Sequence, residues 1–157
     1  MTTIRAAGEA DLADVLRIYN QAVEKTTAVF EYRAHTIEMR REWFRAKQAA
    51  SLPVLVAEES GAVRGFASYG PFRAWPAYKY SVELSVYVDE AARGRGIGTA
   101  LVTELFAEAD ASGRSVSIHV ETNNPARRLY ERLGFQDVGE HGVYVLMERA
   151  VTKMANA

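Results

Sequence analysis

Apolar residues recur along the chain with two different periods, and each period indicates one type of element. Spacings of three and four residues predict helices at 12–23, 37–50, 99–112 and 125–133. Alternating or β-branched apolar runs predict strands at 4–6, 54–58, 63–69, 80–88, 116–121 and 143–147. The resulting order, β-α-α-β-β-β-α-β-α-β, is typical of an α+β fold with a mixed sheet.

The segment from Tyr80 to Val88 is the longest β-rich run, and its side chains alternate between two faces. The two faces are Val82, Leu84, Val86 and Val88 on one side, and Ser81, Glu83, Ser85 and Tyr87 on the other. This pattern predicts a central strand that carries Glu83 on its polar face.

The composition is that of one globular domain. The chain has 157 residues, of which 48% are hydrophobic and 25% charged, and no linker or repeat interrupts it. We expect a single domain over residues 1–150 and a tail over residues 151–157. A chain of this length buries roughly two-thirds of its unfolded surface, so we expect no metal in it.

Several classes of function are excluded or disfavoured by composition. The chain has no cysteine, which excludes disulfides, thiolate metal sites and a cysteine nucleophile. A net charge of -1 argues against nucleic acid as a partner. No apolar stretch has the length of a membrane span or the form of a secretory signal, so we expect no membrane partner and a cytoplasmic location. The expected partner is a small molecule.

The segment Arg93-Gly94-Arg95-Gly96-Ile97-Gly98 joins a predicted strand to a predicted helix. Glycines at a helix N-terminus let backbone N–H groups approach a phosphate, and the two arginines add positive charge. The loop lacks the Lys of a Walker A motif, and its glycine spacing differs from G-x-G-x-x-G. It therefore predicts a phosphate site of another kind; the alternative is a loop that is glycine-rich only to reverse the chain.

The same hexapeptide resembles the R/Q-x-x-G-x-G/A pyrophosphate loop of the GNAT superfamily of acetyl-CoA-dependent N-acetyltransferases. The segment from Asn123 to Phe135 resembles the N-x-x-A-x-x-L-Y-x-x-x-G-F segment of the same family. Segments 18–20, 26–30, 67–73 and 81–88 resemble one subgroup, the phosphinothricin and methionine-sulfoximine acetyltransferases. The resemblance implies the GNAT acyl-CoA N-acyltransferase fold, a mixed central β-sheet flanked by α-helices.

The resemblance also implies residues that bind acetyl-CoA, the co-substrate. Backbone groups of a central strand align with pantetheine, the glycine loop binds pyrophosphate, and Asn123 hydrogen-bonds pantetheine. The implied set is Val86, Tyr87, Val88, Arg93, Gly94, Arg95, Gly96, Ile97, Gly98, Thr99 and Asn123. The alternative role for Asn123 is that of a helix N-cap before Pro125.

Two residues are candidates for proton transfer. Glu83 is the candidate general base, because the subgroup carries a Glu here that contacts the acceptor amine; its alternative role is a cross-strand ion pair. Tyr130 resembles the GNAT tyrosine that protonates the CoA thiolate, and its alternative role is in the core. His119 is expected to face either core or solvent, with a catalytic role less favoured.

The candidate acceptor-binding residues are Arg73, Ala74, Trp75, Glu83 and Phe30, with Tyr78 as a further lining residue. A planar guanidinium suits a carboxylate or phosphinate. For the aromatic residues, packing in the core or in a dimer interface is the alternative. The subgroup forms homodimers, so the resemblance implies one here.

One segment departs from the subgroup. After Phe135 the phosphinothricin-type enzymes carry a longer segment with the pattern G-x-K/R-x-G-x-W, whereas this chain has no Trp after Trp75. The departure concerns one wall of the acceptor site.

The function that the sequence predicts is transfer of the acetyl group of acetyl-CoA to the primary amine of a small amino-acid-like acceptor, of the phosphinothricin or methionine-sulfoximine type. With no cysteine to carry the acetyl group, direct attack in a ternary complex is the simplest route. The alternatives are a GNAT enzyme that acts on a protein N-terminus or another small amine, and a module that binds acyl-CoA without catalysis.

Overall fold

A computed structural model describes residues 1–26 and 33–152 of the chain. The helices are α1 (Leu12–Lys25), α2 (Ile37–Ala49), α3 (Ile97–Ala111) and α4 (Arg127–Arg132). The strands are β1 (Thr3–Ala6), β2 (Val54–Glu59), β3 (Ala62–Pro71), β4 (Ser81–Val88), β5 (Ser115–Glu121), β6 (Gln136–His141) and β7 (Tyr144–Arg149). Three short 3-10 turns are η1 (Glu9–Asp11), η2 (Pro76–Tyr78) and η3 (Glu90–Ala92).

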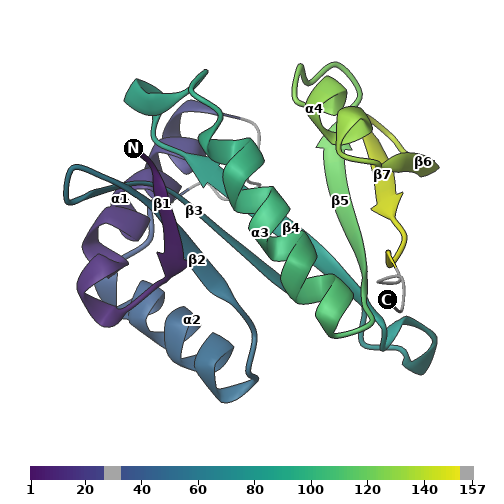
Figure 1. The fold of residues 1–157 in the computed structure, drawn as a ribbon, viewed down its shortest axis with the longest axis horizontal. Helices are drawn as coiled ribbons and strands as arrows, with labels where there is room; N and C mark the ends of the chain where they lie inside the picture. Colours follow the sequence, from purple (N-terminus) through teal and green to yellow (C-terminus); the bar gives the residue numbers. More distant parts are fainter. Residues whose placement is uncertain (27–32, 153–157) are drawn as a thin grey trace. The chain divides into compact units, whose positions relative to one another are not determined.

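The strands form one mixed sheet in the order β1-β2-β3-β4-β5-β7-β6 (Figure 1). β4 and β5 are parallel, with Ser81 beside Ser115 and Glu83 beside Ser117. The pairs β1–β2, β2–β3, β5–β7 and β6–β7 are antiparallel. The expected α+β fold with a mixed sheet is thereby confirmed.

The chain divides into two compact units. The first unit contains residues 1–68 and 85–105, and the second contains 69–84 and the chain from Phe106 onward. β3, β4 and α3 each pass from one unit to the other. The first unit therefore holds the glycine loop, and the second holds Glu83.

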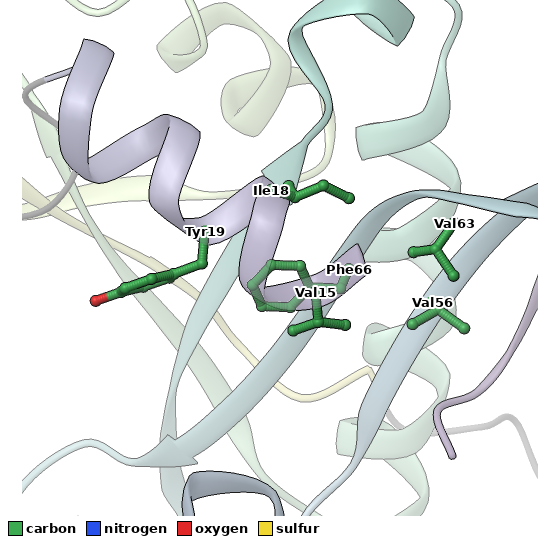
Figure 2. Close-up of a cluster of buried hydrophobic side chains, with 6 residues drawn as sticks. All are labelled: Val15, Ile18, Tyr19, Val56, Val63 and Phe66. Atoms are coloured by element: carbon green, nitrogen blue, oxygen red, sulfur yellow. The ribbon is translucent and has the colours of Figure 1, made fainter. Parts of the chain in front are cut away.

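The first unit is built around the apolar face of α1, which packs on β2 and β3 (Figure 2). The cluster in the figure is Val15, Ile18, Tyr19, Val56, Val63 and Phe66. Leu12, Phe44 and Val54 form a second cluster, which brings in α2. Burying one such side chain stabilises the fold by about 1.5–3 kcal/mol, which is why the helical spacing of apolar residues determines the face that α1 buries.

The predicted start of α2 is confirmed in detail. The Thr36 hydroxyl oxygen accepts a hydrogen bond from the backbone N–H of Met39 at 3.3 Å, as an N-cap residue does. The connection between β2 and β3 is tight, with Ser60 and Gly61 both at positive φ (53° and 79°). The predicted hairpin is thus present as well.

In the second unit, the rings of Phe106, Tyr130 and Phe135 pack together. Phe135 lies with its ring centroid 5.6 Å from that of Phe106 and 5.7 Å from that of Tyr130. The Arg149 guanidinium lies 4.2 Å from the Phe106 ring centre and makes two hydrogen bonds to the Asp110 carboxylate, at 3.0 and 2.9 Å. These contacts connect α3, α4 and β7.

Two expectations about the last third of the chain are wrong. β6 was not expected, because Gln136 to His141 has Val138 as its one large apolar residue. The strand is at the end of the sheet and largely exposed, so it needs no apolar face to form. α4 begins at Arg127 and not at Pro125, because Pro125 lies in a preceding turn in which Asn124 accepts a hydrogen bond from the Ala126 N–H at 2.9 Å.

No helix in the described part of the chain is long and apolar enough to cross a membrane.

Substituting Gly65 with Ala is expected to destabilise the protein by about 1–3 kcal/mol through overpacking. A Cβ at this position in β3 would lie 3.0 Å from the carbonyl oxygen of Tyr87, and 3.1 Å from side-chain carbons of Ile97 and Leu101. The backbone oxygen has little freedom to move away. Denaturant unfolding measures the effect, with Gly139→Ala as the control, because a Cβ there meets nothing within 4 Å. Equal stability of the two variants would contradict this packing.

Asp110→Asn is expected to lower the free energy of unfolding at pH 7 by about 1.5–3 kcal/mol, the range for hydrogen bonds to charged groups. Hydrogen bonding from Arg149, foremost, and from the Thr152 N–H holds the pKa of the Asp110 carboxyl below its ordinary value. A lowered folded-state pKa stabilises the protein above the carboxyl's unfolded pKa, and this stabilisation disappears as pH falls through the folded pKa.

The difference between wild type and Asp110→Asn should therefore vanish in strong acid. Unfolding curves from pH 7 down to pH 2 measure it. Asp137→Asn is the control, because its ion pair with Arg127 leaves the Asp137 side chain 49% exposed, where such pairs contribute little. A loss that is the same at every pH would show that the charge on Asp110 is not the cause.

Candidate active site

The glycine loop leads into the N-terminus of α3, a helix of 15 residues. Gly94 and Gly96 have φ angles of 77° and 80°, a conformation that favours glycine, and a Cβ at either position would meet nothing within 4 Å. The Ala100 N–H donates to the Gly96 carbonyl at 3.0 Å, which closes the first turn. The loop is open and exposed around the helix N-terminus, where backbone donors and the helix dipole favour an anion.

Asp89 fixes the segment that precedes this loop. Its carboxylate is 4% exposed and accepts hydrogen bonds from Arg17 at 3.0 Å and from the Ala91 N–H at 3.2 Å. Burial by itself would raise the pKa of Asp89, but hydrogen bonds from Ala91, Arg17 and Gln21 outweigh it and hold the pKa below its ordinary value. Asp89 is therefore ionised and tethers the start of η3 to α1.

The two arginines of the loop are exposed, and each already has a partner in the first unit. Arg93 Nε donates to the Val88 carbonyl at 3.4 Å. Arg95 donates to Glu59 Oε2 at 3.1 Å and to the Ala91 carbonyl at 3.0 Å. Arg95 can therefore donate two hydrogen bonds to a phosphate only if its hydrogen bond to Glu59 is broken.

In the second unit, Glu83 and His119 are in direct contact. Glu83 Oε1 lies 2.6 Å from His119 Nδ1, and the side chains are 38% and 31% exposed. The contact arises because β4 and β5 are parallel, with Glu83 beside Ser117 and His119 two residues further along the same face of β5. The expected cross-strand partner of Glu83 is thus a histidine, and His119 faces neither core nor solvent alone.

Phe72 holds the other side of His119. Their rings stack with centroids 6.1 Å apart and planes 20° from parallel. The edge of Tyr78 meets the Phe72 ring at 5.3 Å, and the Arg73 guanidinium lies 4.9 Å from the centre of the same ring. Arg73, one of the expected acceptor-binding residues, therefore shares the Phe72 ring as a neighbour with His119, and Phe72 is a residue that the sequence did not single out.

The other expected acceptor-binding residues are less tightly held. Ala74 and Trp75 lie in the exposed loop before η2, and Trp75 is 70% exposed. Phe30 lies outside the described residues.

Three residues expected to align with pantetheine are Val86, Tyr87 and Val88. They are half-buried in the last part of β4, within the first unit.

Tyr130 lies in α4 and is 6% exposed. Burial raises the pKa of its hydroxyl to about 12. The hydroxyl therefore keeps its proton at neutral pH, which is the state that a proton donor needs.

Asn123 lines a surface hollow formed by the turn before α4 and by residues of α4. The hollow is formed by Thr122, Asn123, Asn124, Pro125, Arg127, Arg128 and Glu131. The alternative role of Asn123 as an N-cap is not observed, because Asn124 makes the hydrogen bond to the turn before α4. The exposed Asn123 amide makes no hydrogen bond to another described residue, so it is available to a ligand.

The model of the acetyltransferase (GNAT) family matches residues 14–135, which is more than half of the chain. The chain belongs to this family. Its glycine loop, β4 and α4 all lie inside the matched range. The implied membership is thereby confirmed.

Individual GNAT relatives resemble this chain over almost its whole length. An L-methionine sulfoximine/L-methionine sulfone acetyltransferase from Salmonella typhimurium is 42% identical over 85% of this chain and 79% of its own length. A GNAT superfamily phosphinothricin acetyltransferase from Sinorhizobium meliloti, solved in complex with acetyl-CoA, is 32% identical with a TM-score of 0.88, and the match covers 96% of this chain and 88% of that one.

A third relative has a different kind of acceptor in its name. The crystal structure of a ribosomal-protein-alanine N-acetyltransferase from Brucella melitensis is 38% identical with a TM-score of 0.89, and the match covers 94% of this chain and 99% of that one. The GNAT fold and the use of acetyl-CoA in this family are therefore shown, and the acceptor has to be argued from the site.

Proposed function

We propose that this GNAT domain transfers the acetyl group of acetyl-CoA to the primary amine of a small amino-acid-like acceptor, of the methionine-sulfoximine or phosphinothricin type. The observation that carries the proposal is the contact of Glu83 with His119, beside a Phe72 ring that Arg73 also contacts, in a chain 42% identical to a methionine sulfoximine acetyltransferase. One group of side chains then provides both a proton acceptor and a cation for a carboxylate.

The acetyl donor is held by backbone groups more than by side chains. Backbone N–H groups of Gly94 to Thr99 bind the pyrophosphate, supported by the open glycine conformations and the α3 N-terminus. Val86 to Val88 align with pantetheine, and Asn123 hydrogen-bonds it. Arg93, Arg95 and Ile97 complete the loop, with Arg93 and Arg95 adding positive charge.

The ammonium nitrogen loses two protons in the reaction, one before it attacks and one as the amide forms, and the second of these replaces the proton that Tyr130 gives to the CoA thiolate. Removal of the ammonium proton depends on the Glu83 carboxylate. The free amine attacks the thioester carbonyl, so that a C–N bond forms and the C–S bond breaks. Backbone N–H groups near Val86 stabilise the oxyanion, and the Tyr130 hydroxyl gives its proton to the thiolate. The chain has no cysteine to carry an acetyl group, so direct attack with both substrates bound is the simplest route.

Arg73 and Trp75 bind the acceptor. The exposed Arg73 guanidinium pairs with the carboxylate of an amino acid, and Trp75 forms a wall beside it. The bulk of this wall is expected to limit the acceptor to a small molecule. We also propose that the protein is a homodimer, as the resemblance to the subgroup implies, and that its location is cytoplasmic.

A protein N-terminus is the second candidate acceptor. The β6–β7 hairpin lies where the resemblance to the phosphinothricin-type enzymes would imply a longer segment, and the Brucella melitensis relative is named a ribosomal-protein-alanine N-acetyltransferase. A shorter segment at this wall leaves more room for a peptide.

The acceptor is tested by free-thiol release from acetyl-CoA with four acceptors offered separately: methionine sulfoximine, its carboxamide, phosphinothricin and a short peptide. The proposal expects turnover with methionine sulfoximine and phosphinothricin. It also expects a large loss with the carboxamide, because Arg73 then has no carboxylate to bind. Turnover with the peptide alone would replace the small acceptor by the protein N-terminus.

A further inference from the structure

We propose that His119 is a catalytic residue of this enzyme: its Nε2 atom receives the proton of the acceptor ammonium, while Glu83 orients the ring and keeps its negative charge. The inference rests on the proposed function, because it requires an amine acceptor that arrives as an ammonium ion. It adds His119 to the groups that remove the proton, and it identifies His119 Nε2 as the atom that accepts it.

The Glu83–His119 distance determines which ring nitrogen is available. At 2.6 Å, Glu83 Oε1 and His119 Nδ1 are too close to be two unprotonated acceptors, so a proton lies between them. A carboxylate accepts this proton from Nδ1–H, which leaves the lone pair of a neutral imidazole on Nε2. No described residue hydrogen-bonds to Nε2, and the side chain is 31% exposed, so Nε2 can meet a substrate.

The ring is held so that this lone pair has a fixed direction. Phe72 stacks on one face of the imidazole, and the Phe72 backbone N–H donates to the Ser81 carbonyl at 3.2 Å. Tyr78 fixes Phe72 in turn by its edge contact at 5.3 Å. The imidazole is thus oriented by a carboxylate at Nδ1 and by an aromatic ring against its face, as a general base requires.

The chemistry favours the imidazole as the resting place of the proton. A neutral imidazole is a better general base for an ammonium ion at neutral pH than a carboxylate is. When Nε2 takes the proton, the ring becomes an imidazolium, and its positive charge is stabilised by the adjacent carboxylate. Nε2 then returns the proton to solvent, and the pair is reset without any further reactant.

The charged groups around the pair agree with this assignment. Glu121 lies two residues beyond His119 on the same face of β5, and Glu148 of β7 lies beside Ser117. The Arg73 guanidinium lies over the Phe72 ring, 4.9 Å from its centre. Of these groups, the Glu83 carboxylate is the one in contact with the ring, and it stabilises the positive charge once Nε2 has accepted the proton.

The decisive variant is His119→Asn, because the Asn side-chain amide can still donate to Glu83 near the Nδ1 position but cannot accept a proton. We expect kcat to fall by about 10²-fold, with KM for acetyl-CoA unchanged, since general-base catalysis contributes about 10²–10⁴-fold. Glu121→Gln is the matched control: it removes a carboxylate from the same strand face and is expected to leave kcat unchanged.

The double variant Glu83→Gln/His119→Asn is expected to be no slower than the slower single variant, because the two residues act as one unit. The chain has three histidines, so ¹⁵N NMR can assign His119, and a neutral ring protonated at Nδ1 is expected. His119→Asn with the wild-type kcat, or a neutral His119 protonated at Nε2, would overturn the inference. If His119→Asn is fully active and Glu83→Gln is inactive, the inference about His119 is wrong and the proposed function is kept. If the wild type acetylates no amine, the proposed function and the inference are both wrong.

Discussion

Glu83→Gln is expected to lower kcat by about 10²–10⁴-fold, the range that general acid–base catalysis contributes. The amide has nearly the size of the carboxylate, so the packing of β4 against β5 is kept. It cannot carry the negative charge that stabilises an imidazolium, and its NH₂ group can donate to His119 Nδ1 and favour the wrong tautomer. Steady-state kinetics with methionine sulfoximine at saturating acetyl-CoA measures the loss.

The affinity of Glu83→Gln for acetyl-CoA is the control for this result. Glu83 belongs to the second unit, and the glycine loop belongs to the first, so calorimetric titration with CoA is expected to give the wild-type Kd. A variant that turns over at the wild-type rate would show that Glu83 has no part in removing the proton. A variant that has lost CoA binding would show that Glu83 has a structural role instead.

Tyr130→Phe has the second largest expected effect, a loss of about 10²-fold in kcat. Burial raises the pKa of the hydroxyl to about 12, so wild-type Tyr130 stays protonated at neutral pH and can give a proton to the thiolate. Phe keeps the ring and its contact with Phe135 but has no proton to give. The measurement is kcat for thiol release with the best acceptor.

Thermal unfolding separates this loss from damage to the core. Phe fills the same space as Tyr, and the described residues offer no hydrogen bond to the Tyr130 hydroxyl, so the Tm of Tyr130→Phe is expected to stay close to that of wild type. Burial raises the pKa of the Tyr130 hydroxyl, so the folded state favours the neutral phenol. The free energy of unfolding is therefore unaffected by this hydroxyl below pH 10, and it falls as pH rises from 10 toward 12. Unchanged kcat in a stable Tyr130→Phe variant would assign Tyr130 to packing alone.

Elements that bury an apolar face could be predicted from the sequence. α1 and α2 show their buried faces as three- and four-residue spacings, and Thr36 marks the start of α2. The glycine loop could be predicted because it needs a positive φ at positions 94 and 96, and this backbone conformation strongly favours glycine. β6 gave no such signal, since an exposed edge strand can be polar on both faces.

The candidate site was predictable residue by residue, but its contacts were not. The pattern of β4 places Glu83 on a polar face, but its partner depends on the β4–β5 register, which pairs Glu83 with Ser117 and brings His119 within reach. A parallel register joins segments far apart in the chain and leaves no local spacing to detect. The pairing of Arg95 with Glu59 is hidden for the same reason, because the two residues are 36 positions apart.

The most direct test of the central claim is the amount of free thiol released and of N-acetyl product formed when wild-type protein is supplied with acetyl-CoA and L-methionine sulfoximine. The account predicts rapid turnover in which one thiol is released for each acceptor amine acetylated. Thiol release without an acetylated amine, or no release with this acceptor and rapid release with a peptide, would contradict it.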